Sequence, residues 1–499
     1  MKKYQKNLLS VMLVIVCLLS MTACSASMAP TSAMPNGSGY LEGDLGGESY
    51  TEIVENAFVS AAENNTSYFS IDANTASYPN LRSLINNQYN IPKDAVRVEE
   101  MLNYFHYDYA TPTDGAVLSL TASVFDTPYN SETKLLTIGL AAQQIEFSEI
   151  QNNLVFLIDT SGSMFGADRL DLVKSAFMML AENLNPEDRV SIVTYAGSSS
   201  VALDGAFGYE KQKIMAVIED LEAGGSTAGA DGINSAYRLA EKYYIDGGNN
   251  RVILATDGDF NVGVSSTGGL EQLISEKRDS GVYFSVFGVG RGNLKNDKME
   301  TLALKGNGTC SYIDSKSEAR RALVEQIGGT MITVAKDVKA GITFNVDYVE
   351  SFRLIGYENK LLTQEEFENS ETDAGELGSG HTVTVVYEIK LTEKALTEGE
   401  NLAQVVVKYK PTENVGGDEA EQELIMDIST AAYHAQPTQT DAFVAGVVEF
   451  ALLLRDSQYK ADADLNALIK RLQALDLSAD AFKEEFRQLV YLYQKQKKD

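Results

Sequence analysis

The fold is decided by the stretch Leu154-Val-Phe-Leu-Ile-Asp-Thr-Ser-Gly-Ser163, an apolar run that ends in oxygen-bearing side chains. A run that is apolar at every position is typical of a strand buried on both faces, which indicates a parallel sheet covered by helices. A second such run, Val252-Ile-Leu-Ala255, is also followed by an aspartate, Asp257. We therefore expect two aspartates at the carboxyl edge of one parallel sheet.

Around this strand, from residue 153 to residue 329, β-branched runs alternate with amphipathic segments. This alternation predicts repeated βα units in a doubly wound, Rossmann-like sheet. The expected strands are residues 154–158, 189–195, 200–203, 251–256, 282–289 and 309–313. The expected helices are residues 168–184, 210–221, 230–244, 270–280, 294–305 and 316–327. The first and fourth strands are neighbours in the usual order of such a sheet, so Asp159 and Asp257 should face each other.

The Asp-x-Ser-x-Ser run offers the carboxylate of Asp159 and the hydroxyls of Ser161 and Ser163 at alternate positions. Thr227, which precedes an expected helix, and Asp257 add two more oxygen donors. Ligands of a doubly wound sheet gather beyond the strand ends, and Mg²⁺ prefers an incomplete set of protein oxygens that leaves room for water. The run alone is also compatible with a helix-capping turn. The positions of the threonine and the second aspartate favour a metal site.

These five residues resemble the metal-ion-dependent adhesion site of von Willebrand factor type A (VWA) domains. The resemblance implies that Asp159, Ser161, Ser163, Thr227 and Asp257 hold Mg²⁺ or Mn²⁺. It also implies a protein partner that offers an acidic residue to the metal.

The flanks resemble a family that carries such a domain, the bacterial lipoproteins of the YfbK type. The amino-terminal likeness rests on residues 69–78 and 96–105, and the carboxy-terminal likeness on residues 335–338, 353–359 and 373–382. Period-two runs after residue 330 predict antiparallel strands, and helical spacing returns near the carboxyl end. The expected organisation is an α+β domain at 63–150, the VWA domain at 151–330, a β-rich domain at 331–430 and a helical segment at 431–499.

The amino terminus has the order of a signal peptide. Lys2, Lys3 and Lys6 precede an apolar run from Leu8 to Ser20, and Cys24 follows. The run is short for a membrane span of ~20 residues, although a transmembrane anchor stays the alternative. The pattern resembles a bacterial lipoprotein signal. It implies removal of residues 1–23, acylation of Cys24, a flexible tether at 24–62, and an exported protein held at the bacterial membrane in the cell envelope.

Composition excludes several classes of protein. The chain has 41 Lys and Arg against 70 Asp and Glu, a net charge of −29, which opposes nucleic-acid binding. His106, His381 and His434 lie far apart, so no histidine zinc motif can be written, and no GxxxxGK[ST] motif supports nucleotide binding. His381 is interpreted as part of a glycine-rich turn. A calcium loop beginning at Asp257 would lack the glycine and glutamate that an EF-hand needs.

The leading functional hypothesis is a membrane-anchored envelope protein, not an enzyme, whose VWA domain binds a protein ligand through a divalent cation. The first alternative is a structural scaffold of an envelope complex, in which the metal acts as a folding clamp. The weakest alternative is a metal-dependent hydrolase, because the motif places no general base beside the metal.

Overall fold

The computed structural model describes residues 48–71, 73–225, 230–258, 267–278, 280–291, 295–394 and 399–498, all within the unit Leu41–Asp499. The predicted signal peptide, Cys24 and most of the predicted tether lie outside these residues. Within the described ranges, no helix has the length and apolar character of a membrane span.

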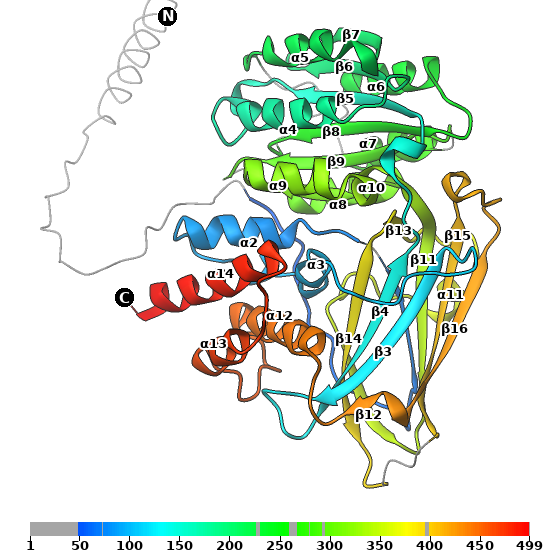
Figure 1. Ribbon diagram of the computed structural model, residues 1–499, viewed down its shortest axis with the longest axis vertical. Coiled ribbons are helices and arrows are strands. Elements are labelled where there is room, and N and C mark those ends of the chain that lie inside the picture. The colour runs from blue at the N-terminus through cyan, green and yellow to red at the C-terminus, as the bar shows by residue number, and fades with distance from the viewer. Residues whose placement is uncertain are drawn as a thin grey trace, which may run out of the picture. The chain divides into compact units, whose positions relative to one another are not determined.

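The predicted apolar strands form a six-stranded sheet in the order β10-β9-β8-β5-β6-β7, shown in teal and green in Figure 1. The strands are β5 (Asn152–Asp159), β6 (Arg189–Tyr195), β7 (Ser199–Phe207), β8 (Asn249–Thr256), β9 (Tyr283–Val289) and β10 (Cys310–Ile313). All pairings are parallel except that of the edge strand β7 with β6. The order is that of a doubly wound sheet, and the predicted contact of the first and fourth strands is confirmed by the pairing of β5 with β8.

Helices cover both faces of this sheet (Figure 1). The helices are α4 (Leu170–Glu182), α5 (Lys211–Glu219), α6 (Ala230–Lys242), α7 (Thr267–Arg278), α8 (Asn296–Lys305), α9 (Lys316–Arg320) and α10 (Ile327–Met331). Alternate residues of β5 enter different cores: Leu154, Phe156 and Ile158 pack with α4, and Val155 and Leu157 pack with α6. This explains why the strand is apolar at every position. The expected helix over 316–327 is interrupted by a π-helical turn, η5 (Arg321–Glu325).

The segments that precede and follow the α/β domain in the sequence together form two further β-sheets. One has the order β1-β12-β14-β4-β3-β17, and the other has the order β13-β11-β15-β16 with β2 paired to β11. The first contains β1 (Val59–Ser60), β3 (Leu118–Asp126), β4 (Lys134–Ala142), β12 (Val349–Ile355), β14 (Thr382–Leu391) and β17 (Tyr433–His434). The second contains β2 (Thr66–Ser70), β11 (Thr333–Phe344), β13 (Gly375–Gly378), β15 (Asn401–Pro411) and β16 (Gln422–Ser429). The α/β domain is thus inserted between strands that pair with each other, while the predicted domain limits stay predictions.

A group of helices packs on the first of these sheets through a separate apolar core. The group comprises α2 (Ser77–Asn86), α3 (Val98–Asn103), α12 (Gln439–Arg455), α13 (Leu465–Gln473) and α14 (Ala481–Lys498). Phe105, Phe443 and Phe486 meet in this core with ring centroids 5.0–5.6 Å apart. Segments from the two ends of the chain therefore fold together.

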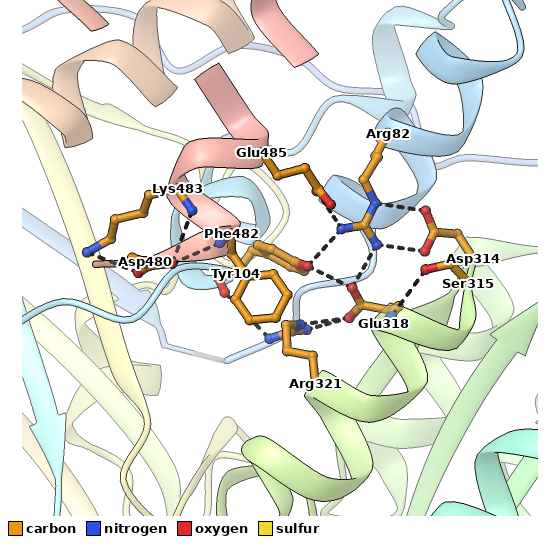
Figure 2. A network of polar contacts seen from close by, with 10 residues as sticks. All are labelled: Arg82, Tyr104, Asp314, Ser315, Glu318, Arg321, Asp480, Phe482, Lys483 and Glu485. Atoms are coloured by element: carbon orange, nitrogen blue, oxygen red, sulfur yellow. Dashed lines mark hydrogen bonds and ion pairs between the residues drawn. The ribbon is translucent and has the colours of Figure 1, made fainter. Parts of the chain in front are cut away.

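An ionic cluster joins these helices to the α/β domain (Figure 2). Arg82 on α2 lies 2.6 Å from Asp314, 2.8 Å from Glu318 on α9 and 2.8 Å from Glu485 on α14. Arg321 pairs with Glu318 at 2.7 Å from the other side. We call Arg82, Asp314, Glu318, Arg321 and Glu485 the ionic cluster. It fixes the last helical segment of the α/β domain against both flanks.

Candidate metal centre

Asp159 is the last residue of β5, and its side chain is fully buried. The main-chain N–H of Ser161 donates to Oδ1 over 2.8 Å, and the hydroxyl of Thr256, at the end of β8, donates to Oδ2 over 3.1 Å. The carboxylate is therefore held in place by groups from two neighbouring strand ends, as expected for the carboxyl edge of a parallel sheet.

The two serines of the motif converge beside this carboxylate. They flank Gly162 around a short 3₁₀ turn, η3 (Gly162–Met164), and their Oγ atoms lie 3.0 Å apart. Ser161 is 2% exposed, whereas Ser163 is partly exposed. The hydroxyl pair therefore forms a path from the buried carboxylate toward solvent.

Asp257 follows β8 directly and is 1% exposed. Its negative charge contributes to the raised pKa of Asp159, so the two carboxylates lie within electrostatic reach of each other. The chain turns away after Asp257 at Gly258, whose φ of +95° favours glycine. The structure thus brings together four of the five predicted donors.

Thr227 lies outside the described residues. The segment leading to it is described, and it hydrogen-bonds to the Asp-x-Ser-x-Ser loop: the N–H of Gly224 donates to the carbonyl of Thr160 over 2.8 Å, and the N–H of Gly162 donates to the carbonyl of Gly225 over 3.1 Å. Main-chain hydrogen bonds therefore hold the two loops together. Ligation by the five residues stays a prediction.

The electrostatics of the site fit a hard dication. Burial, together with the charge of Asp257, raises the pKa of Asp159 to about 6, against the hydrogen bonds from Ser161 and Thr256 that lower it. In the described part of the chain, no Lys or Arg forms an ion pair with Asp159. Nor do these residues contain a metal-binding group of three or more His, Cys, Asp or Glu. The donor set is instead acid and hydroxyl oxygen, which suits Mg²⁺ or Mn²⁺.

Two neighbours of the site could not be assigned from the motif. Arg169 donates from Nη1 to the carbonyl of Ser163 over 2.7 Å and from Nη2 to that of Arg291 over 2.8 Å, so it ties the motif loop to the loop after β9. Its side chain crosses Gly290, where an added Cβ would lie 2.7 Å from Arg169 Cγ. Phe165 projects from the same loop and is 82% exposed. Neither role has a signal in sequence beyond proximity to the motif.

Two features of the sequence were not assigned to the site: His381 and the loop that begins like a calcium-binding loop at Asp257. Burial lowers the pKa of His381 to about 4, helped by the charge of Arg321, and its Nδ1 accepts a weak hydrogen bond of 3.4 Å from the N–H of Gly378. This agrees with the turn interpretation. Most of the dismissed calcium loop, residues 259–266, lies outside the described residues.

Comparison with known proteins finds relatives over nearly the whole chain. Family models match residues 44–137 ("von Willebrand factor"), 153–326 ("von Willebrand factor type A domain") and 329–496 ("Uncharacterized protein YfbK, C-terminal"). A curated protein of Homo sapiens, inter-alpha-trypsin inhibitor heavy chain H3, is 26% identical over 274 residues, which cover 50% of this chain and 30% of that protein. Among solved structures, a von Willebrand factor type A protein from Catenulispora acidiphila covers 77% of this chain and 91% of its own, with 16% identity and a TM-score of 0.43.

A bacterial protein is similar over most of the chain. "Uncharacterized protein YfbK" of Escherichia coli (strain K12) is 35% identical over 468 residues, which cover 89% of this chain and 80% of that protein. The match includes the inserted α/β domain and both flanks that complete its surrounding sheets. The chain therefore belongs to the YfbK family of bacterial proteins with a VWA domain.

Proposed function

We propose that this chain binds a protein partner through a divalent cation held by Asp159, Ser161, Ser163, Thr227 and Asp257. The observation that carries the proposal is the fully buried carboxylate of Asp159, which has no ion-pair partner in the described chain and lies beside two converging hydroxyls. A buried carboxylate is costly unless a positive charge compensates it. A cation at the sheet edge would supply that charge.

A bound Mg²⁺ would offer an open coordination position to a carboxylate of the partner. The hydroxyls of Ser161 and Ser163 are neutral, so the set neutralises less of the ion's charge than an all-acid set would. Asp159 and Ser161 are shielded from water, whereas Ser163 reaches the surface. The partner's carboxylate is therefore expected to approach from the Ser163 side.

The arrangement favours partner binding over a folding clamp. The loops around the site are already joined by hydrogen bonds of Gly162 and Gly224 to main-chain carbonyls, so a cation is not needed to hold them. Replacing Thr227→Ala separates the two functions. A binding module should lose the partner and keep its fold, whereas a clamp should lose stability as well.

A non-enzymatic role is part of the proposal. His106, His381 and His434 all belong to the flanking regions of the sequence, and the described motif loop contains Asp, Ser and Thr but no Lys or His. General-base catalysis with metal-bound water therefore has no candidate base in the motif itself. Turnover of a peptide or phosphoester panel that disappears with EDTA would contradict this part of the proposal.

The proposed location of the protein is the bacterial cell envelope, where an acylated Cys24 would anchor the chain to the membrane. The support is the order of basic residues, apolar run and cysteine in the first 24 residues. Replacing Cys24→Ser should abolish labelling by radioactive palmitate in the native host. Undiminished labelling of the variant would contradict the assigned lipid position.

The metal is tested by its effect on stability. Mg²⁺ at 100 times its Kd should raise the free energy of unfolding by about 2.7 kcal/mol, since only the folded state holds the ligands together. Asp159→Ala should abolish this increase. Asp168→Ala is the matched control, because Asp168 is close in sequence and pairs with Arg291 at 3.5 Å but is outside the predicted set. An unchanged increase in Asp159→Ala would refute the site.

A further inference from the structure

Phe165 is the most exposed large apolar side chain of the described residues, with 82% of its surface accessible. It stands two positions after Ser163, the member of the predicted metal set that reaches solvent. A single exposed apolar residue is ordinary on a protein surface. This one is unusual for its position next to a proposed binding site.

The turn that carries Phe165 is fixed on both sides. Met164 is fully buried in the apolar core, and its N–H donates to the carbonyl of Ser161 over 3.0 Å. On the other side, the N–H of Arg169 donates to the carbonyl of Gly166 over 3.2 Å, and Gly166 has a φ of +142°. Because the main chain is held in this way, the aromatic ring is presented to solvent from a defined place.

The spacing matches that of neighbouring residues in a bound segment. Consecutive Cα atoms are ~3.8 Å apart, so the Cα atoms of Ser163 and Phe165 lie within about 7 Å of each other. A partner whose carboxylate reached a metal beside Ser163 would have its next one or two residues within reach of Phe165. Aromatic side chains that bury apolar area at an interface often dominate its affinity.

The charges at this edge also suit an acidic partner, although the whole chain carries −29. In the described structure, Arg169 donates to two carbonyls and forms no ion pair within 4 Å. Arg291 is partly exposed and pairs with Asp168 at 3.5 Å. Arg169 thus places beside the motif loop one positive charge that no carboxylate of the described residues pairs with, which offsets the negative field at short range.

We propose that Phe165 is the apolar half of a two-point site that recognises an exposed protein segment with an Asp or Glu and, within two positions of it, a large apolar side chain. The carboxylate half rests on the proposed function. Phe165 itself does not hold the metal; it adds affinity and selects the residue next to the acid.

The experiment uses the full-length chain and a panel of immobilised peptides. Each peptide has a central Asp or Glu whose neighbours are Leu, Phe or Ser, and binding is measured in Mg²⁺ and in EDTA. Peptides with Leu or Phe beside the acid should bind in Mg²⁺ only, and Phe165→Ser should weaken that binding by about tenfold or more. Phe165→Leu should restore part of it.

The matched control is Tyr209→Ser. Tyr209 is 64% exposed on η4 (Gly208–Glu210), which follows β7 at the opposite edge of the same sheet. Binding to the peptides should be unchanged in this variant. Calorimetric titration with Mn²⁺ alone supplies a second readout, in which Phe165→Ser should match the parent chain.

The outcomes distinguish failure of the two-point site from failure of the proposed metal site. If the parent chain binds no Mn²⁺, the proposed metal site fails. If Mn²⁺ binds but peptides with Ser beside the acid bind as well as those with Leu, or if Phe165→Ser binds peptides like the parent, the two-point site is wrong. Mn²⁺ binding without capture of any peptide in the panel also contradicts the assigned partner.

Discussion

Asp159 and Glu318 are two buried carboxylates of the same domain with opposite electrostatic surroundings. Burial alone would raise the pKa of Glu318, but the charges of Arg321 and Arg82 lower it below its ordinary value, and the hydroxyl of Tyr104 donates to it over 2.7 Å. Burial and, to a smaller extent, the negative charge of Asp257 raise the pKa of Asp159 to about 6. Among the described residues, arginines compensate the charge of Glu318, whereas no positive side chain pairs with Asp159.

We propose that this difference separates a structural acid from a ligand-binding acid. Glu318 belongs to the ionic cluster, where Arg82 and Arg321 replace the water that burial removes (Figure 2). Asp159 has hydrogen bonds from Ser161 and Thr256 but no positive partner in the described chain. Its missing charge is expected to come from outside the chain.

The largest expected effect on stability comes from replacing Glu318, whose charge is compensated by two arginines. Glu318→Gln leaves Arg82 and Arg321 close together without the charge between them, so the free energy of unfolding should fall by about 3–5 kcal/mol. Urea denaturation followed by circular dichroism measures the loss. Glu485→Gln is the control within the same cluster, because the Glu485 side chain is 38% exposed and should contribute less than about 1 kcal/mol. Equal losses in the two variants would mean that burial does not decide the role of these acids.

A third acid, Glu99 on α3, is buried like Glu318 but only partly compensated. Burial and the charge of Glu358 raise its pKa to about 7, against the charges of Arg97 and Arg455, and its Oε2 has no hydrogen-bond partner among the described residues. The folded state therefore binds a proton that the unfolded state has released between about pH 4.5 and pH 7. In that window the contribution of Glu99 to stability falls as the pH rises.

Glu99→Gln should remove this dependence. The variant should match the parent chain below about pH 4.5 and be more stable above about pH 7, by an amount on the order of 1–3 kcal/mol. Thermal unfolding of both proteins over this range measures the difference. Glu100→Gln, next to it on α3, is the control and should keep the pH dependence, since Glu100 instead accepts a 2.8 Å hydrogen bond from the N–H of Ser77. A constant difference between Glu99→Gln and the parent would contradict the assignment.

Sequence patterns predicted the elements that depend on local spacing. The six strands of the α/β sheet were found from their apolar runs, and the neighbouring positions of Asp159 and Asp257 followed from the usual order of such a sheet. The resemblance to VWA domains named the donor set. These features depend on short stretches whose side chains are read directly from the sequence.

Long-range pairing was not predictable in the same way. The strands β4 and β14 pair although the whole α/β domain separates them in the chain. The alternation of residues within a strand does not identify which distant strand it pairs with. The ionic cluster has the same character, because Arg82 and Glu485 are ordinary surface residues in the pattern of their own helices. The exposure of Phe165 could not be predicted from the sequence either. The conformation of the turn decides that Met164 is buried and Phe165 is exposed. Tertiary contacts decide these features.

The smallest expected effect on stability comes from replacing Asp159, which has no positive partner among the described residues. Whereas Glu318→Gln should lower the free energy of unfolding, this substitution should raise it when no metal is bound. Asp159→Asn removes a buried negative charge beside Asp257 while keeping an oxygen that can accept from the N–H of Ser161. In EDTA the variant should therefore be more stable than the parent chain, by roughly 1 kcal/mol in urea denaturation. In saturating Mg²⁺ the order should invert, because only the parent gains from the metal.

The same substitution at Asp188 is the control. Asp188 is also fully buried, but it lies at the opposite edge of the sheet, and its carboxylate accepts hydrogen bonds from the main-chain N–H groups of Asn152 and Asn185 over 2.8 and 2.7 Å. Asp188→Asn places an amide N–H group against a donor, so it should lose about 1–3 kcal/mol with or without Mg²⁺. If Asp159→Asn loses as much in EDTA as Asp188→Asn, the carboxylate of Asp159 is a structural acceptor. In that case the contrast with Glu318 does not identify a metal ligand.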